Sequence, residues 1–408
     1  RLWGDRGYSV LAVSASGEWS DRRSLGVVEG DTLLFGDHNE RAVRVRNVNR
    51  LVTGKNSSLN LGFDVELERS KYSYLTGAFE DRLGNPVPRR EVEQNWSDTR
   101  LGGFASHIWQ VTPRFEATTG LRVERRGASG QVELSPRFAS SLALNDRLRL
   151  TGAVGLYRQR LPSYILAQDP AFEDLASPRA LHVVGGMNYL FSPSTQFTVE
   201  AYLKEYDRFP LEVEDPTLFV VDDGTSQAGF RSYRTLVDEG RASSRGVEML
   251  VQKKLTQKVY GTASASWFSS RYRDLDGEWR SRAWDNRWVA TLVGGYRPSH
   301  AWEFSGRWSA AGGAPYTPFD IPASTALNSG VIDPSRINAV RHPAYHSLNL
   351  RVDHRTVLRG SSITTYLSVW NVYGRENVSQ FYWNEVEGRP DTLKQWGLFP
   401  VIGMEWRF

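Results

Sequence analysis

Alternation of apolar and polar residues constrains this chain more than any other feature of its sequence. Along one stretch, Trp302, Phe304 and Trp308 fall on one face. Glu303 and Arg307 fall on the opposite face. The same period of two recurs in the segments 115–124, 197–204 and 348–353. Since successive side chains of a β-strand point to opposite faces, the pattern predicts an all-β chain.

The alternating segments are long for a soluble protein. A strand of about 12 residues, rising ~3.3 Å per residue and tilted by ~45°, spans roughly 28 Å, close to the hydrocarbon thickness of a bilayer. Strands of soluble proteins average about five or six residues. No apolar run approaches about 18 residues, which excludes transmembrane helices. A membrane β-barrel stays possible, because its strands alternate apolar and polar residues.

Short turns and long polar connections alternate along the chain. Gly54-Lys55, Pro193-Ser194 and Arg359-Gly360 are examples of the short turns. We predict about 16 strands. Short turns at one rim and long loops at the other are typical of an outer-membrane barrel. The predicted strands are 7–20, 40–53, 57–74, 98–111, 114–126, 131–144, 147–159, 181–192, 195–207, 242–254, 257–272, 286–297, 300–311, 346–357, 361–373 and 399–408. The expected fold is a transmembrane antiparallel up-and-down β-barrel over 1–408, without a second domain.

The composition excludes several classes of protein. The formal net charge is only +4, so charge gives no reason to expect a nucleic-acid partner. There is no Cys, which excludes disulfides and thiol chemistry. A nucleophile elbow, a phosphate-binding Gly loop and a His-Glu-x-x-His zinc motif are all missing. We therefore expect no enzyme, no cofactor and no metal site.

Two clusters resemble metal ligands but lack the matching context. His342 and His346 are four residues apart, yet they straddle Pro343 in a predicted loop, so no helix aligns them. The segment 274–278 contains part of a calcium-loop pattern, which a solvated loop tip explains better.

The alternation also assigns side chains to the two faces of the barrel. The polar face is expected to line the lumen. Its candidates are Arg122, Glu124, Glu200, Lys204, Glu303, Arg307, Arg351 and Asp353. Aromatic side chains in the long loops are candidates for contact with a solute, although aromatics near strand ends more often form the interfacial girdle. They are Trp279, Tyr316, Phe319, Phe381, Tyr382, Trp383 and Trp396.

The last residues form an alternating strand that ends on an aromatic residue. Trp406 and Phe408 share its apolar face. The ending resembles the signal that outer-membrane assembly machinery recognises, and that machinery is an expected partner. Without this resemblance, the segment is simply a last edge strand.

Six segments from about residue 131 to the end form an ordered series. They are Leu134–Phe138, Arg245–Glu248, Gly313–Pro318, Tyr345–Asp353, Asn371–Asn377 and Pro400–Phe408. In this order and spacing they resemble the barrel of TonB-dependent outer-membrane receptors. The resemblance implies a plugged barrel of about 22 strands in the outer membrane of a Gram-negative bacterium. It also implies a periplasmic TonB-type energising protein and a scarce large solute, such as a siderophore-type chelate, cobalamin, an oligosaccharide or a peptide.

The chain departs from the family pattern in three respects. Trp288 stands where the family often has His after Asp-x-Arg. Nothing in the sequence resembles the plug domain or a TonB-contacting box. The predicted strands are also about six fewer than the family barrel has. We therefore expect a barrel that is incomplete at its N-terminal side, with the plug missing.

Two other functions remain compatible with the sequence. A passive 16-strand porin-like channel, or a structural outer-membrane barrel, would need no energising partner. A soluble or surface β-rich binding protein would be extracted without detergent. A plug sequence upstream of Arg1 would distinguish the importer from the passive pore.

Overall fold

The computed structural model describes residues 2–25, 32–127, 130–223 and 232–408, and its main element is one 17-stranded sheet. All of its strands except the three-residue β14 (Trp279–Ser281) are long. The prediction of about 16 strands is therefore confirmed. The long strands are β1 (Gly7–Leu25), β2 (Thr32–Gly54), β3 (Ser57–Thr76), β6 (Arg90–Thr112), β7 (Phe115–Arg125), β8 (Val132–Ala143), β9 (Leu148–Arg158), β10 (Arg179–Ser192), β11 (Thr195–Glu212), β12 (Leu236–Thr256), β13 (Val259–Arg273), β15 (Trp288–Tyr296), β16 (Trp302–Ala311), β19 (Tyr345–Leu358), β20 (Ser361–Trp370) and β23 (Phe399–Arg407).

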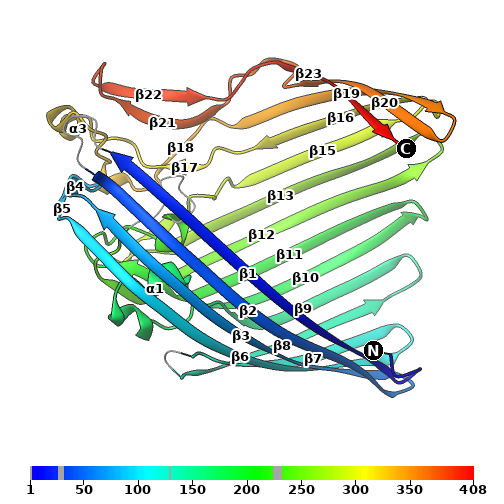
Figure 1. Ribbon diagram of the computed structural model, residues 1–408. Coiled ribbons are helices and arrows are strands. Elements are labelled where there is room, and N and C mark those ends of the chain that lie inside the picture. The colour runs from blue at the N-terminus through cyan, green and yellow to red at the C-terminus, as the bar shows by residue number, and fades with distance from the viewer. Residues whose placement is uncertain (1, 26–31, 128–129, 224–231) are drawn as a thin grey trace.

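Each long strand pairs antiparallel with the next long strand along the chain. This is the predicted up-and-down order. Figure 1 shows the short turns gathered at one end of the sheet and the long loops at the other. The smaller elements of the long loops are β4 (Phe79–Glu80), β5 (Pro86–Val87), α1 (Ser163–Leu166), η1 (Pro170–Asp174), α2 (Val220–Asp223), β17 (Pro315–Tyr316), α3 (Ile321–Leu327), η2 (Pro334–Arg336), β18 (Val340–Arg341), β21 (Val378–Asn384) and β22 (Arg389–Lys394). No helix in the described residues is long and apolar enough to span a membrane.

The sheet is strongly curved, and its concave face encloses the main apolar cluster. Tyr72 and Tyr74 on β3 and Trp96 on β6 belong to this cluster, together with Ile165 from α1 and Leu236 on β12. Side chains from strands so far apart in the sheet can share one cluster only on its inner side. The loop 159–178 and the described segments 213–223 and 232–235 fold inward to complete the cluster at the loop end of the sheet.

Arginines tie the inward loops to one another and to the wall. Arg82, between β4 and β5, donates to both carboxylate oxygens of Asp215 at 2.7 and 3.0 Å. Arg126 donates to the Leu175 carbonyl at 2.9 Å. Asp215 is fully buried, so its charge requires this pairing. The loops therefore form an ordered cap over part of the concave face.

The convex face carries an apolar band. Phe304 is aligned across the strands with Tyr296 and Val352, and it is 44% exposed. Trp302 lies on the same face, also 44% exposed, and stacks beside Phe304. Contiguous exposed apolar surface of this kind indicates an apolar environment outside the sheet. The facing that the alternation predicts for these residues agrees with their exposure.

The two edges of the sheet do not pair with each other. In the described part of the chain, β1 pairs with β2 alone and β23 pairs with β20 alone. A closed 16-strand barrel is therefore not what the structure shows.

Several strands extend further toward the loop end than predicted. β6 begins at Arg90, whereas the alternation predicted a start at 98. Here Val92 and Trp96 pack beneath the inward loops, and polar residues occupy the other face. The sequence signal for membrane strands fades in this region because the convex face is no longer apolar.

Candidate functional site

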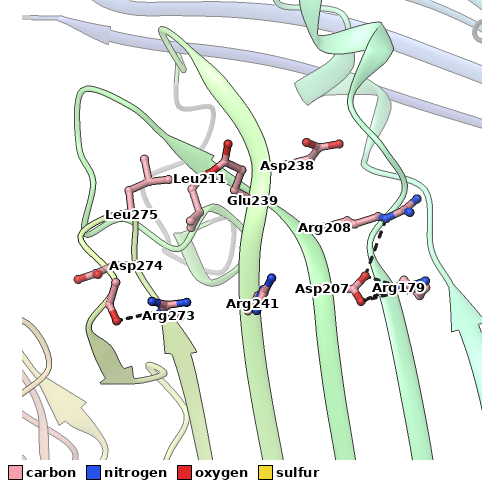
Figure 2. Close-up of a pocket in the computed structure, with 11 residues that line it drawn as sticks. Arg179, Asp207, Arg208, Leu211, Asp238, Glu239, Arg241, Arg273, Asp274 and Leu275 are labelled. Carbon is pink, nitrogen blue, oxygen red and sulfur yellow. Dashed lines mark hydrogen bonds and ion pairs between the residues drawn. The ribbon is translucent and has the colours of Figure 1, made fainter.

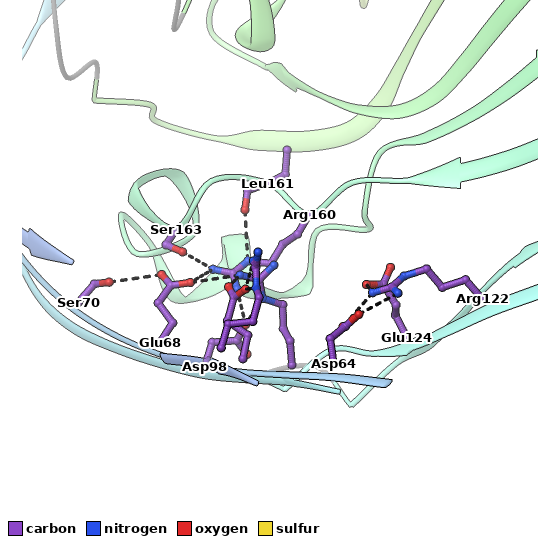
Figure 3. A network of polar contacts seen from close by, with 12 residues as sticks. Asp64, Glu68, Ser70, Asp98, Arg122, Glu124, Arg160, Leu161 and Ser163 are labelled. Atoms are coloured by element: carbon purple, nitrogen blue, oxygen red, sulfur yellow. Dashed lines mark hydrogen bonds and ion pairs between the residues drawn. The ribbon is translucent and has the colours of Figure 1, made fainter. Parts of the chain in front are cut away.

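A dense network of charged side chains covers the concave face of β3, β6 and β7. Arg122 donates to both carboxylate oxygens of Asp64 at 2.9 Å and to Glu124 at 2.7 Å. Glu66 pairs with Arg44 and Arg100. Figure 3 shows Asp64, Arg122 and Glu124 projecting from the strands toward the interior. The predicted lumen candidates Arg122 and Glu124 thus lie together on the concave face.

Arg160 joins this network from the inward loop 159–178. Its guanidinium contacts Asp98 and Glu68, the latter at 3.2 Å. The side chains of Arg160, Glu68 and Asp98 are only 11%, 10% and 4% exposed. A loop residue therefore neutralises two buried carboxylates on strands that lie far from it in sequence.

A second polar region lies on the concave face near the turn end of β13–β23. Arg351 pairs with Asp353 at 2.5 Å, and its guanidinium carbon lies 3.8 Å from the ring centre of Tyr366. Glu303 accepts from Arg297 Nε at 2.9 Å and also from Tyr260. Both ion pairs and Tyr260 line a cavity of about 630 Å³. Three further predicted candidates, Glu303, Arg351 and Asp353, are thus brought together.

The remaining lumen candidates are more dispersed. Lys204 Nζ lies 4.9 Å from the ring centre of Tyr202. Glu200 is aligned with Glu248 on the neighbouring strand. Arg307 is exposed and donates to Ser309 at 3.2 Å.

An aromatic cluster lies among the loops at the other end of the sheet. The rings of Tyr316, His342 and Phe381 are mutually packed, with centres 4.6 to 5.0 Å apart. Phe319 and Trp383 form an edge-to-face pair with centres 5.8 Å apart. Four of the seven predicted loop aromatics therefore meet in two contacts, and His342 takes part in the first of them. We call these five residues the aromatic mouth.

Two polar atoms of the aromatic mouth have no partner in the described part of the chain. His342 Nδ1 and Trp383 Nε1 are both buried and make no hydrogen bond there. Burial also lowers the pKa of His342, so its imidazole is kept neutral. An unpaired buried donor or acceptor is costly, and a bound molecule would satisfy it.

The other predicted aromatics lie elsewhere. Tyr382 is on the opposite face of β21 from Phe381, is 38% exposed, and donates to Asp391 at 3.3 Å. Trp279 is 41% exposed on β14. Trp396 is 75% exposed. At the chain end, Phe408 is 98% exposed and contacts Trp406 edge to face.

The family model for the TonB-dependent receptor-like β-barrel matches residues 3–372. The chain belongs to this family. Its members are receptors and transporters, not enzymes. No curated protein matches the chain.

Solved structures of TonB-dependent receptors share the fold. The ferric-catecholate import receptor Fiu of E. coli K12 superposes with a TM-score of 0.68 at 10% identity, over 99% of this chain and 62% of that one. The ferric citrate transporter FecA gives 0.70 at 10% identity, over 100% and 60%. The ferric enterobactin receptor PfeA of Pseudomonas aeruginosa gives 0.70 at 13% identity, over 99% and 59%. The chain thus spans about three fifths of these receptors' length.

The receptor-like motifs have visible structural roles. Asn377 accepts from the His346 amide at 3.2 Å and donates to the His346 carbonyl at 3.0 Å. Asn371 donates to the Arg375 and Trp396 carbonyls. A Cβ at Gly313 would lie 1.6 Å from the His342 carbonyl oxygen, so only glycine fits there. These positions fix the loops that carry Tyr316, His342 and Phe381.

Sequence reasoning missed several residues of these sites. Arg160 gave no signal, because its partners Glu68 and Asp98 are more than 60 residues away. His342 was considered only as a metal ligand with His346. In the structure it stacks on aromatics, whereas His346 Nδ1 lies 2.8 Å from the Tyr373 hydroxyl. The described residues contain no group of three or more potential metal-ligating His or acidic side chains.

The acidic segment 274–278 forms a tight loop. Asp274 accepts from the Glu278 amide at 2.7 Å and from Arg280 at 2.5 Å. Gly277 has a φ of +90°, as such a turn requires. The Asp274 carboxylate is thus engaged within the loop, and Asp276 and Glu278 are exposed, in keeping with a polar loop tip.

Proposed function

We propose that this chain is part of a TonB-dependent receptor that imports a scarce large solute across the outer membrane of a Gram-negative bacterium. The observation that carries the proposal is the aromatic mouth set above a charged concave wall. A solute would meet aromatic faces and two unpaired polar atoms at the loop end. The polar wall beyond it suits a lumen filled by a plug.

The full receptor would contain further strands and a plug domain. In support, the described sheet has two unpaired edges, which are untenable in lipid. The charged side chains of the concave wall would make polar contacts with the plug. Such contacts can be replaced by hydrogen bonds to water when the plug is released. A TonB-type periplasmic protein would supply the energy for release, because nothing in the chain resembles a nucleotide-hydrolysing site. The outer-membrane lipid and the barrel assembly machinery are the other proposed partners.

We favour a metal chelate as the solute. The similar structures include receptors named for ferric catecholate, ferric citrate and ferric enterobactin, and a copper transporter with a TM-score of 0.63. Aromatic rings can stack on the planar groups of such chelators. Cobalamin, oligosaccharides and peptides are the alternatives for the same site.

Transport by cells that contain or lack the protein tests the proposal. We expect saturable uptake of one member of a panel of radiolabelled ferric chelates, and uptake should stop when a protonophore collapses the proton gradient. Uptake that is linear in concentration and insensitive to the protonophore would contradict an energised importer.

The second candidate is a passive channel or structural barrel. It would have the mass of this chain, 46.1 kDa, in the membrane-extracted protein, and it would conduct ions in planar bilayers without a partner. A larger intact mass, with a plug sequence before Arg1, would favour the importer.

The aromatic mouth yields a direct prediction. Changing Phe381 to Ala should weaken chelate binding roughly tenfold, because an aromatic contact at a ligand site is lost. The half-saturating chelate concentration in the uptake assay measures the effect. Changing the neighbouring Tyr382 to Ala is the matched control, since its side chain lies on the opposite face of β21. Equal effects of the two changes would show that the aromatic mouth is not part of the binding site.

The last residue should matter for assembly and not for stability. Phe408 lies beyond the end of β23 and is almost fully exposed, so its deletion removes only its edge contact with Trp406, itself 59% exposed. We expect a lower yield in the outer membrane and an unchanged unfolding temperature of the assembled protein. Changing Phe408 to Tyr keeps the ring and should preserve the yield. A normal yield after deletion would show that the assembly machinery does not read this residue.

A further inference from the structure

Four arginines gather on the convex face of two neighbouring strands near the loop end. Arg241 and Arg245 are on β12, and Arg271 and Arg273 are on β13. All four are exposed. The alternate residues Ala242 and Tyr272 are 0% and 1% exposed because they pack under the loops on the concave side. The four arginines must therefore point outward, away from the lumen.

This arginine cluster lies directly beyond the apolar band. Strand register aligns Arg245 with Leu203 and with Ser269. The next outward-facing row toward the turn end contains Val247 and Trp267, and Trp267 is 54% exposed. An exposed Trp at the edge of an apolar surface is typical of a membrane interface. The arginines thus occupy the level at which lipid headgroups would begin.

A small hollow opens between the arginines. It has a volume of about 200 Å³ and is lined by Ser243, Arg245, Ser269, Arg271 and Trp279. None of these lining residues is a carboxylate. Two hydroxyls and two guanidinium groups are the donors that a phosphate group accepts from.

The outer pair of arginines borders a larger hollow of about 570 Å³. Figure 2 shows Arg241 and Arg273 on adjacent strands, with Glu239 and Asp238 beyond Arg241. That hollow is balanced in charge, because its lining contains four arginines and four carboxylates, among them the Arg179–Asp207 ion pair at 2.5 Å. The excess of positive charge is therefore concentrated at the smaller hollow.

The partners of the four arginines differ in kind. Arg271 donates to the Trp279 carbonyl at 2.5 Å, and Arg273 donates to the Gly277 carbonyl at 3.0 Å. Among the described residues, Arg241 and Arg245 make no hydrogen bond or ion pair. Beside the smaller hollow, Glu205 accepts from Ser243 at 2.7 Å, whereas the larger hollow contains Asp207, Asp238, Glu239 and Asp274. Two of the four arginines, Arg241 and Arg245, thus have no partner in the described chain.

We infer that the arginine cluster binds the phosphate group of an anionic lipid in the surrounding leaflet. The inference rests on the proposed placement in the outer membrane. A lipid would insert its acyl chains along the apolar band beside Trp267 and bring its phosphate to the hollow. A lipid bound in this way would cover the exposed apolar surface with its acyl chains and neutralise the adjacent positive charge with its phosphate. The bound lipid would also fix the height and rotation of the barrel wall beneath the inward loops.

Native mass spectrometry of the full-length protein in detergent tests this inference. Dioleoyl phosphatidate, dioleoyl phosphatidylcholine and inorganic phosphate serve as the probes. The double variant R241Q/R245Q removes two arginines that make no bond within the described chain. R147Q/R359Q is the matched control, because it removes two exposed arginines from short turns at the opposite end. Heat-dependent gel mobility verifies that both variants fold.

We expect the double variant to bind phosphatidate roughly tenfold or more weakly, while the control binds like the native protein. Phosphatidylcholine should bind weakly to all three, and inorganic phosphate should not displace phosphatidate. Unchanged phosphatidate binding by R241Q/R245Q, or equal binding of phosphatidylcholine, would overturn the inference. Displacement by inorganic phosphate alone would assign the hollow to a free anion in place of a lipid.

These outcomes are separable from a failure of the proposed function. A protein that stays dispersed without detergent would overturn the membrane placement itself. A membrane-inserted protein whose phosphatidate adducts ignore the double variant would overturn only the lipid site.

Discussion

Changing Phe304 to Arg should destabilise the assembled protein by about 2–4 kcal/mol if the residue lies near the bilayer midplane. Phe304 belongs to the apolar band of the convex face, where Tyr296 and Val352 are its neighbours across the strands. A guanidinium there would have to leave water for an apolar surrounding. Urea unfolding of the protein in lipid vesicles measures the loss, and heat-dependent gel mobility measures the folded fraction.

The next residue provides the matched control. Ser305 lies on the concave face and lines the cavity of about 630 Å³ that also contains Glu303 and Asp353. Changing Ser305 to Arg introduces the same side chain into a polar, roomy site, and we expect little loss of stability. Changing Arg307 to Ala should likewise leave assembly intact. Equal losses for Phe304 and Ser305 would contradict the assignment of the two faces.

Changing Arg160 to Ala should cost about 3 kcal/mol, at the lower end of the range for breaking a buried ion pair. The change removes one of the two arginines that pair with the buried carboxylates of Glu68 and Asp98, and the other, Arg100, lies at 3.6 and 3.9 Å from them. The inward loop 159–178 would also lose its link to the wall. Thermal unfolding measures the loss, and faster proteolysis within this loop reports its release.

Two further variants make this result specific. Arg160 to Lys keeps the charge but cannot donate to two carboxylates in the same geometry, so an intermediate loss is expected. Arg407 pairs with Glu405 in an exposed position, and its change to Ala should have no measurable effect. A stable Arg160 variant with a protected loop would show that apolar packing alone holds the cap.

The order of the strands in the sheet was predictable because it depends only on local sequence patterns. Alternation identifies strands such as 115–124 and 300–309. Short turns such as Pro193-Ser194 mark where one strand ends and the next begins. An up-and-down sheet pairs each strand with its chain neighbour, so no further information is needed to order it. The family motifs from Leu134 onward then specify which barrel it is.

The candidate site was predictable only in part. Alternation places Arg351 and Asp353 on one face, and the structure pairs them. It also places Arg122 with Glu124, and the structure adds Asp64 from two strands away. Loop aromatics carry no such periodicity. Tyr316 and Phe381 could be named as candidates, but their meeting with His342 could not be foreseen.

By itself, the sequence determined the fold class and the strand order, and it predicted a face for the residues of each alternating segment. These properties follow from the period of two. A shift of one residue in strand register would turn the polar face of the strand toward the apolar surrounding. Only the tertiary structure decided how the long loops fold inward and which side chains meet there. The contacts of Arg160 with Glu68, and of His342 with Phe381, join segments far apart in the chain. They depend on the curvature of the whole sheet, which no local pattern encodes.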